Sequence, residues 1–476
     1  MSRIKSLIRN TVVIALGNIC TKFISFFLLP LYTSLLSTEE YGTVDLFSTY
    51  ISLLLPLATL MIEQGAFRYL ITKEENGITE ETIVSSSFFI ICILNTAFVL
   101  FGILFFQFYQ NDYKYYLIPI LVSASIFHWC LQLARGFKRL TLYSVGSVVS
   151  AFFQILLNVL FITVLHMGAK GMLIATVFGN CFGAFFIFFN LRAYKYIHIK
   201  SFDMDISKKM LSYSLPLIPN TLSLWIINSS DRTIVNYFLG TSSNGILAVS
   251  HKFPTIIQTF YTIFQLSWHE LGTVHWNDPD RDSFFAKMID SIVRVFSSIC
   301  IVIIAIMPFA FNLFVRNIDY ASAYMTIPIY IIAVLINIVI GLMGVVYVAT
   351  KKTTEIAKTT IFAGVINIIL HFALIKSIGL YAAAVSTFIA YVCALVFRVR
   401  DVNKYIRLKF NIKNIAVIIV SVIILMICYY SQITMIYIVG VILSVLVACY
   451  LCRDMLHYIV GYFFKLISVR REKESE

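Results

Sequence analysis

The sequence predicts an all-α integral membrane protein with about 14 transmembrane helices. Hydrophobic residues make up 59% of the 476 residues and charged residues only 13%, whereas a soluble domain carries about 25% charged residues. Apolar runs recur along the whole chain, and each is close to the roughly 20 residues that a membrane-spanning helix needs. Together these features exclude a soluble globular protein and a disordered one.

The predicted helices follow the apolar runs in order. The runs do not alternate with a period of two, and they exceed the roughly ten residues of an outer-membrane barrel strand. Their backbone groups must therefore be satisfied within each segment, as in a helix. The first run is too long for the apolar part of a cleavable signal peptide, so we expect it to remain as a helix. The runs lie at about 11–36, 42–70, 82–108, 115–137, 141–166, 170–191, 209–237, 246–270, 287–314, 321–349, 356–376, 380–398, 413–430 and 433–452.

Basic residues between the runs predict that both termini are cytoplasmic. With the N-terminus placed inside, the inner segments hold 28 Lys and Arg, Arg398 among them, and the outer loops hold four. Lys and Arg favour cytoplasmic loops, so this asymmetry supports an even number of spans. Topology and contact with anionic lipid then account for the net charge of +13, and no nucleic-acid partner is predicted.

Motifs for metal, nucleotide or covalent chemistry are missing from the sequence. The nine cysteines lie in or beside apolar runs, and only Cys449 and Cys452 are closely spaced, so packing is their expected role. There is no Walker motif and no glycine-rich nucleotide loop. The longest stretches outside the runs, at about 192–208, 271–286 and 399–412, are too short for a catalytic domain. We therefore expect no metal, no cofactor and no enzymatic activity.

Two internal matches predict that the chain contains two similar halves. Shifted by 203 residues, segment 36–42 falls on 239–245, and with an offset near 208, segment 158–176 falls on 367–384. Because six helices separate the matched segments, the repeats are parallel and related by an axis along the membrane normal. The predicted domains are a first lobe at 1–200 (helices one to six), a second lobe at 201–400 (helices seven to twelve), and two further helices with a cytoplasmic tail at 401–476.

Ionisable residues inside the spans form the candidate site, because they are costly in lipid and usually face a cavity or a partner. Lys22 lies roughly 18 Å into the first helix, too deep to reach the membrane surface easily. Arg68 has the alternative of snorkelling to the cytoplasmic surface, and His128 that of a hydrogen-bonded core residue. Cations at several depths would suit an anionic head group. The predicted substrate-binding residues are Lys22, Arg68, His128, Arg232, Lys252 and Arg294.

Two acidic residues within the spans have several possible roles. Asp231 is adjacent to Arg232 in the sequence, and it can neutralise that residue or Lys252. Glu63 can pair with Arg294, or it can bind a proton or a sodium ion. Asp231 and Glu63 are therefore predicted to be ion-coupling or charge-pairing residues.

Several short motifs resemble those of one bacterial family. They are Phe26-Phe-Leu-Leu-Pro-Leu-Tyr-Thr33, Leu36-Ser37, Glu40-Tyr-Gly42, Asp45-Leu46, Asn158…Gly171…Ala175-Thr176, Gln265-Leu-Ser-Trp268 and Ala349-Thr350-Lys351-Lys352. The chain resembles the Wzx-type oligosaccharide flippases, the polysaccharide-biosynthesis branch of the multidrug/oligosaccharidyl-lipid/polysaccharide exporter superfamily. The resemblance implies two six-helix lobes that form a V around a central cavity and give alternating access. It carries over no fixed catalytic residue.

The resemblance also implies a cargo, an undecaprenyl-pyrophosphate-linked oligosaccharide. It would move from the cytoplasmic to the outer leaflet of the bacterial inner membrane, for synthesis of O-antigen, capsule or exopolysaccharide. The implied partners are this cargo and membrane lipids, with a polysaccharide polymerase and chain-length proteins as further candidates. A proton or sodium gradient is a candidate driving force.

Other functions stay open at this point. One is a lipid II flippase for peptidoglycan. Another is a cation-coupled drug antiporter, which would favour acidic residues in its cavity, whereas the charges deep in the spans are mostly basic. A membrane enzyme would be expected to have a large polar loop with clustered acid and base residues, and the sequence has none.

Overall fold

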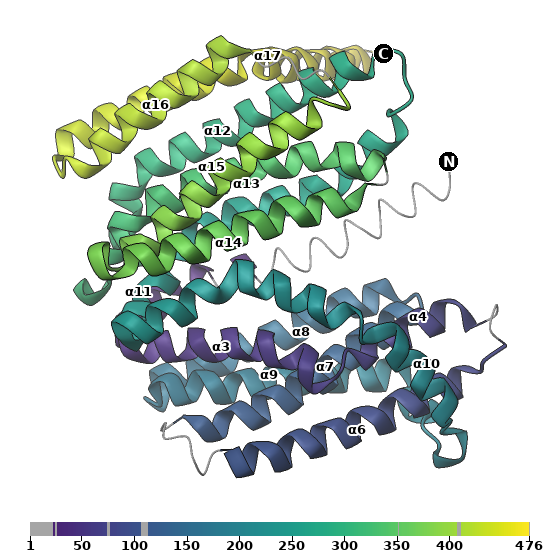
Figure 1. The fold of residues 1–476 in the computed structure, drawn as a ribbon. Helices are drawn as coiled ribbons and strands as arrows, with labels where there is room; N and C mark the ends of the chain where they lie inside the picture. The colour runs from purple at the N-terminus through teal and green to yellow at the C-terminus, as the bar shows by residue number, and fades with distance from the viewer. Residues whose placement is uncertain are drawn as a thin grey trace. The chain divides into compact units, whose positions relative to one another are not determined.

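The computed structural model describes residues 22–23, 26–73, 77–105, 113–350, 352–406 and 411–475. Within these ranges all regular elements are helices (Figure 1). The first half contains α2 (Leu29–Leu35), α3 (Thr38–Ala58), α4 (Ile62–Ile71), α6 (Glu80–Phe105), α7 (Lys114–Gly136), α8 (Leu140–Val159), α9 (Gly168–Leu191) and α10 (Met204–Ser214). The second half contains α11 (Leu217–Val274), α12 (Arg281–Phe314), α13 (Ser322–Ala349), α14 (Thr353–Ile378), α15 (Tyr381–Val402), α16 (Ile412–Tyr430) and α17 (Thr434–Ser475).

The predicted membrane-spanning helices are present. Eleven helices of the described chain are long and apolar enough to cross a membrane, and α3 with α4, bent by 60°, make a twelfth span if they count as one. One of the eleven contains two helices that meet at Gly240, where φ is 84° and ψ is 171°, a conformation that residues with a Cβ avoid. Thirteen predicted runs thus have their helices; half of the first run, 11–36, lies outside the described residues, and its described part contains α2. The all-α membrane fold is confirmed.

The chain packs into two compact units. Unit 1 comprises Met1–Lys252, Asn317–Tyr320 and His371–Leu380, and unit 2 comprises Phe253–Arg316, Ala321–Leu370 and Tyr381–Glu476. Helices α11 and α14 each contribute one part to each unit. The division into lobes at 1–200 and 201–400 stays a prediction.

Both ends of α3 are fixed by local chemistry. At its start, Ser37 Oγ accepts a hydrogen bond from the Glu40 amide at 3.1 Å, and the Glu40 carboxylate accepts one from the Ser37 amide at 3.1 Å, which makes a reciprocal capping box. At its end, Leu60 and Met61 have φ values of 47° and 53°. Left-handed backbone is costly for residues with a Cβ, and these two residues break the span between α3 and α4.

In unit 1, residues of α4, α6, α7, α9 and α10 form one apolar core. Trp129 of α7 is almost fully buried and donates through Nε1 to Ser87 Oγ at 3.1 Å. Two neighbouring serines of α6 hold the basic segment 192–209. Ser85 Oγ donates to the Tyr196 carbonyl at 2.7 Å, and Ser86 Oγ accepts from the Asp203 amide at 3.0 Å. This segment is therefore fastened onto the helices of unit 1.

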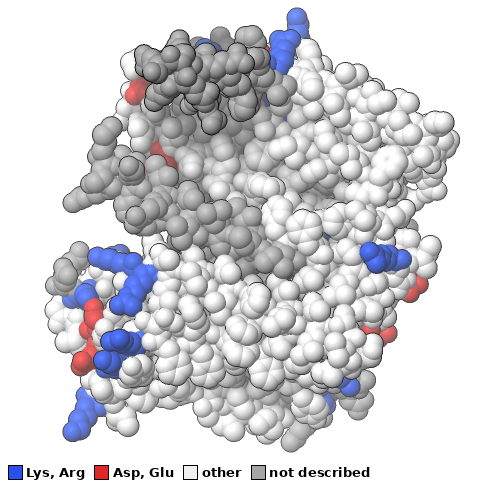
Figure 2. Space-filling model, turned by 180° about the vertical axis from the view of Figure 1, so that it is seen from behind, with Lys and Arg blue, Asp and Glu red and all other residues white. Residues whose placement is uncertain are grey.

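The surface is mostly uncharged. Among the described residues on the face seen in Figure 2, Lys, Arg, Asp and Glu lie mainly near the edges, and the rest of the described surface is almost entirely white. Many exposed side chains are large and apolar, such as Phe101 on α6, Phe185 on α9 and Ile427 on α16. Apolar surface of this extent suits contact with lipid chains.

Unit 2 contains a buried arginine that the sequence does not reveal. The sequence analysis placed Arg398 among the basic residues of the cytoplasmic segments. In the structure it lies within α15 and is only 3% exposed. Its guanidinium donates to the Ile340 carbonyl of α13 at 3.1 Å and to the Ile356 carbonyl of α14 at 3.3 Å, and it also bonds Thr359 Oγ1. Arginine carries five donors in a planar fork, so one side chain can tie three helices together.

Candidate functional site

Segments 36–42 and 239–245, which the internal repeat matches at an offset of 203 residues, contact each other in unit 1. A Cβ on Gly42 would collide with the Thr241 carbonyl oxygen, and a Cβ on Gly245 would collide with the Thr38 carbonyl oxygen. Each residue of one segment is 203 positions from its counterpart in the other, so the contact has the symmetry of the repeat. Thr38 Oγ1 also lies 2.6 Å from Ser242 Oγ. The helices approach this closely because both positions lack a side chain.

An ion pair lies one turn further along α3. Arg232 Nε is 2.8 Å from Asp45 Oδ2, and each side chain is about one-fifth exposed. Asn244 donates to the Gly42 carbonyl at 3.0 Å and reaches Asp45 Oδ2 at 3.4 Å. Trp225 Nε1, on the same helix as Arg232, donates to the Thr49 carbonyl of α3 at 2.9 Å. In Figure 1, α3 and this part of α11 run side by side.

A second acid is paired with a histidine that the sequence did not single out. His371 Nδ1 of α14 lies 3.1 Å from Asp231 Oδ1 of α11. His371 has no exposed surface, and its Nε2 has no hydrogen-bond partner among the described residues. Neutralisation of Arg232 or Lys252 by Asp231 stays a prediction; the carboxylate 2.8 Å from Arg232 Nε is that of Asp45.

Two further ionisable residues of α11 complete what we call the charged cluster. His251 interacts electrostatically with Asp45, Asp231 and Arg232, and Lys252 with Asp45 and Arg232. The cluster holds two carboxylates, two cationic side chains and two histidines. The cluster therefore has less excess positive charge than the sequence alone indicates. It consists of Asp45, Asp231, Arg232, His251, Lys252 and His371.

Four other predicted site residues of unit 1 lie outside this cluster's ion pairs. Lys22, Arg68 and His128 are exposed, and none forms an ion pair in the part of the chain that the structure describes. Glu63 is 6% exposed, and its Oε2 lacks a hydrogen-bond partner there. Glu63 is thus a buried acid that forms no ion pair with any cation among the described residues.

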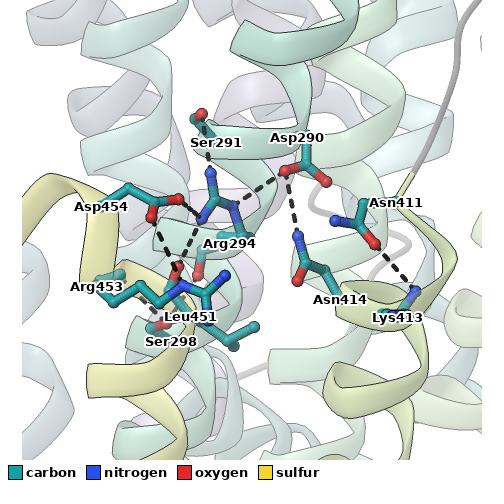
Figure 3. Close-up of polar contacts among 11 residues, drawn as sticks. Asp290, Ser291, Arg294, Ser298, Asn411, Lys413, Asn414, Leu451, Arg453 and Asp454 are labelled. Atoms are coloured by element: carbon teal, nitrogen blue, oxygen red, sulfur yellow. Dashed lines mark hydrogen bonds and ion pairs between the residues drawn. The ribbon is translucent and has the colours of Figure 1, made fainter.

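Arg294, the predicted site residue of unit 2, is doubly paired (Figure 3). Its Nε lies 3.0 Å from Asp290 Oδ2, and its Nη1 lies 2.8 Å from Asp454 Oδ2 and 3.0 Å from the Leu451 carbonyl. Asn414 of α16 donates to Asp290 at 3.3 Å. These bonds fasten α16 and α17 to α12. The acids on Arg294 are therefore Asp290 and Asp454, whereas the sequence analysis considered Glu63.

Asp290, Arg294 and Asn414 also line an apolar cavity in unit 2. Its volume is about 760 Å³, and its walls come from α12, α13, α15 and α16. Asp290, Arg294, Ser297 and Asn414 supply its polar lining, and the other residues are aliphatic, Met or Phe. Such a cavity can hold an apolar chain with a polar group at one end.

Many membrane-spanning helices with ionisable residues inside the spans are a pattern typical of membrane transporters. The sequence comparison then assigns the family: the model for polysaccharide biosynthesis protein matches residues 7–267. The chain belongs to this family, which confirms the resemblance seen in its motifs. No curated protein matches it.

Solved structures share the fold. The lipid II flippase MurJ, in an inward closed conformation, superposes with a TM-score of 0.68 at 15% identity, covering 94% of this chain and 100% of that one. An inward-facing multidrug resistance MATE family transporter of the MOP superfamily gives 0.65 at 12% identity, covering 84% and 98%. A MOP superfamily transporter from Pyrococcus furiosus gives 0.55 at 13% identity, covering 84% and 96%. At these identities the similarity establishes the fold alone.

Proposed function

We propose that the protein is a flippase that moves an undecaprenyl-pyrophosphate-linked oligosaccharide from the cytoplasmic to the outer leaflet of the bacterial inner membrane. Membership of the polysaccharide biosynthesis family supports a role in making O-antigen, capsule or exopolysaccharide. The observation that carries the proposal is the charged cluster, because a balanced set of acids and bases inside a membrane protein can exchange partners with an anionic head group. A polymerase and chain-length proteins would act on the cargo after release.

Arg232 and Lys252 are the proposed contacts of the pyrophosphate. Arg232 already donates one hydrogen bond to a carboxylate through Nε, and a guanidinium can bind a phosphate group through two parallel N–H···O bonds. The phosphate would replace Asp45, and the return of Asp45 would help to release it. The exposed residues Lys22, Arg68 and His128 are proposed to contact the head group at other stages of passage.

The apolar cavity of unit 2 is the proposed place for part of the polyprenyl chain. Its walls are apolar over nearly their whole extent, and its polar lining includes Arg294. An isoprenoid chain would bury its hydrocarbon surface there. Burial contributes a favourable free energy of about 25 cal/mol per Å² of apolar surface, but only for surface that was in contact with water before. Arg294, neutralised by two acids, would mark the polar end of the cavity.

A reconstitution assay tests the function. Full-length protein in proteoliposomes should move lipid-linked oligosaccharide between leaflets, measured by access of an impermeant sugar-modifying enzyme to the outer leaflet. Lipid II is the comparison substrate, since the MurJ structure shares this fold. Movement of lipid II with no movement of the oligosaccharide lipid would favour the peptidoglycan alternative. If the sugar were chemically changed before the sugar-modifying enzyme is added, the result would instead favour an enzymatic activity of the protein itself.

Substitution of Lys22 tests its proposed contact. Lys22→Gln should reduce flipping at least tenfold while folded protein stays in the membrane, because an unpaired cation at this depth costs roughly 2.5–3.5 kcal/mol and is worth keeping only for a function. Lys22→Arg keeps the charge and should keep part of the activity. Full flipping by a variant carrying Lys22→Gln, Arg232→Gln and Lys252→Gln together would contradict the whole head-group assignment.

The proposed topology has its own test. Both termini and the segment 192–209 should be cytoplasmic, because the inner segments hold 28 basic residues against four outside. In a cysteine-free background, single cysteines at positions 203 and 474 should resist an impermeant thiol reagent in intact cells and react after lysis. A cysteine at position 166, between α8 and α9, serves as the control that should react in intact cells. Labelling of 203 or 474 before lysis would overturn the topology.

A further inference from the structure

We infer that a groove of unit 2 between α14 and α15 binds an anionic phospholipid with a single phosphodiester, such as phosphatidylglycerol. The groove has a volume of about 490 Å³, which lies within the usual range of ligand sites, about 300–1,000 Å³. Phe362 of α14 and one side of α15 line it. This inference goes beyond the proposed transport, because the lipid that it names is bound by the protein and is not its cargo.

The lining of the groove changes from apolar to basic along α15. Val396, Arg400 and Lys404 line it at intervals of four residues, so they follow one side of the helix and the turn after it. Arg400 lies about 6 Å beyond Val396 along the axis. Phe362 and Phe397, whose ring centroids are 5.7 Å apart, widen the apolar part. An acyl chain therefore suits one end of the groove, and a phosphate group suits the other.

Arg400 supplies the charge that is available to a head group. It is exposed, and within the described ranges it forms no ion pair. Lys404 Nζ donates to Asp401 Oδ1 at 2.9 Å, and Tyr347 Oη donates to Asp401 Oδ2 at 2.7 Å. Asp401 therefore offsets the charge of Lys404, and the groove keeps one net positive charge. A guanidinium can bind a phosphate group through two parallel hydrogen bonds.

Buried contacts fix the helix turn that carries Arg400. Two residues earlier, Arg398 donates to the carbonyls of Ile340 in α13 and Ile356 in α14. The bond from Tyr347 ties Asp401 to α13 as well. Because this end of α15 is held to two other helices, the groove is formed before a lipid arrives. A preformed site loses less conformational freedom on binding.

Charge and shape together favour an anionic phospholipid over other phosphate compounds. A zwitterionic phospholipid brings a cation, and the groove's only carboxylate, Asp401, already has donors on both oxygens. A pyrophosphate carries more negative charge than Arg400 alone can balance, and a soluble phosphate leaves the apolar lining unused. The stretch 399–412 after the apolar run is predicted to be cytoplasmic. Anionic lipids are a component of that leaflet.

Photo-crosslinking of the full-length protein in lipid nanodiscs is the test. The probe is phosphatidylglycerol with a diazirine in one acyl chain. Mass spectrometry of peptides measures the label on segment 392–397 relative to segment 93–104, an exposed apolar part of α6. Unlabelled phosphatidylglycerol should displace the probe from 392–397 about fivefold better than phosphatidylcholine does, since one basic residue at a membrane surface contributes about 1 kcal/mol.

Variants assign the preference to Arg400. Arg400→Gln should lose the preference for phosphatidylglycerol, and Arg400→Lys should keep most of it because the charge remains. Lys413→Gln is the matched control, because it removes an exposed cation at the start of α16 that does not line the groove. This control should behave as the wild type does. Thermal unfolding of the purified variants checks that each is folded.

The competing lipids and phosphates give the contrary outcomes. Equal displacement by phosphatidylcholine, or an unchanged preference in folded Arg400→Gln, overturns the site. Stronger displacement by lipid-linked oligosaccharide would assign the groove to the cargo, and displacement by glycerol 3-phosphate would indicate a site for soluble phosphates. Either result overturns the inference. Because the experiment measures no transport, its outcome is independent of the proposed flippase function.

Discussion

Gly245→Ala is expected to remove most of the folded protein from the membrane and to abolish transport. The added Cβ would overlap the Thr38 carbonyl oxygen and would lie only 3.0 Å from the Gly42 backbone nitrogen. Backbone atoms within two packed helices cannot rotate away as a side chain can, so α3 and α11 would have to separate. Overpacking in a core costs about 1–3 kcal/mol, a large share of the stability of a typical protein. Gly42→Ala should have a similar effect, because Gly42 meets Thr241 in the mirrored contact.

A matched control is available within the same fold. Gly344 lies within α13, five residues before its C-terminal end, and a Cβ placed there would meet no atom closer than 3.8 Å. Alanine also favours a helix over glycine by about 1 kcal/mol, so Gly344→Ala should be neutral or stabilising. Thermal unfolding of the purified proteins and their yield from membranes measure both changes. Equal behaviour of Gly245→Ala and Gly344→Ala would show that the close helix contact contributes nothing.

The helices could be predicted from sequence because lipid imposes a simple rule. Each span needs its own run of apolar residues, and all runs from 42–70 onward have a helix in the structure. The repeat was also visible, because its glycines and short polar residues recur at a fixed offset of 203. That Gly42 and Gly245 touch each other was not predictable, since an offset shows similarity and says nothing about contact.

The partners of the charged residues could not be predicted. Asp45 is 187 positions from Arg232, and His371 is 140 positions from Asp231. Such pairs depend on how helices cross, and no local pattern reports that crossing. His371 lies within an apolar run with nothing to distinguish it from a packing residue. Only composition gave a weak indication of the partners. A buried cation needs an acid nearby, and Asp45 was one of the few acids within the runs.

Variants of the Asp45–Arg232 pair can distinguish a role in stability from a role in transport. Asp45→Asn leaves Arg232 without the carboxylate that lies 2.8 Å away, and it should both destabilise the protein and slow flipping by more than tenfold. Removing one partner of a fully buried pair costs about 3–5 kcal/mol. Because about one-fifth of each side chain is exposed, water compensates part of this, and we expect a loss nearer to about 1–3 kcal/mol. Arg232→Gln should destabilise less, because a lone carboxylate can be protonated.

The double variant Asp45→Asn with Arg232→Gln tests the role in transport. Two neutral amides can hydrogen-bond to each other, so stability measured by thermal unfolding should return to near the wild-type value. Flipping of lipid-linked oligosaccharide should stay lost, because the cation that is proposed to replace its carboxylate with phosphate is gone. Arg232→Lys keeps a charge without the bidentate geometry, so it should recover folding and only part of the flipping. If the double variant flips at the wild-type rate, the pair holds α3 to α11 and takes no part in binding the head group.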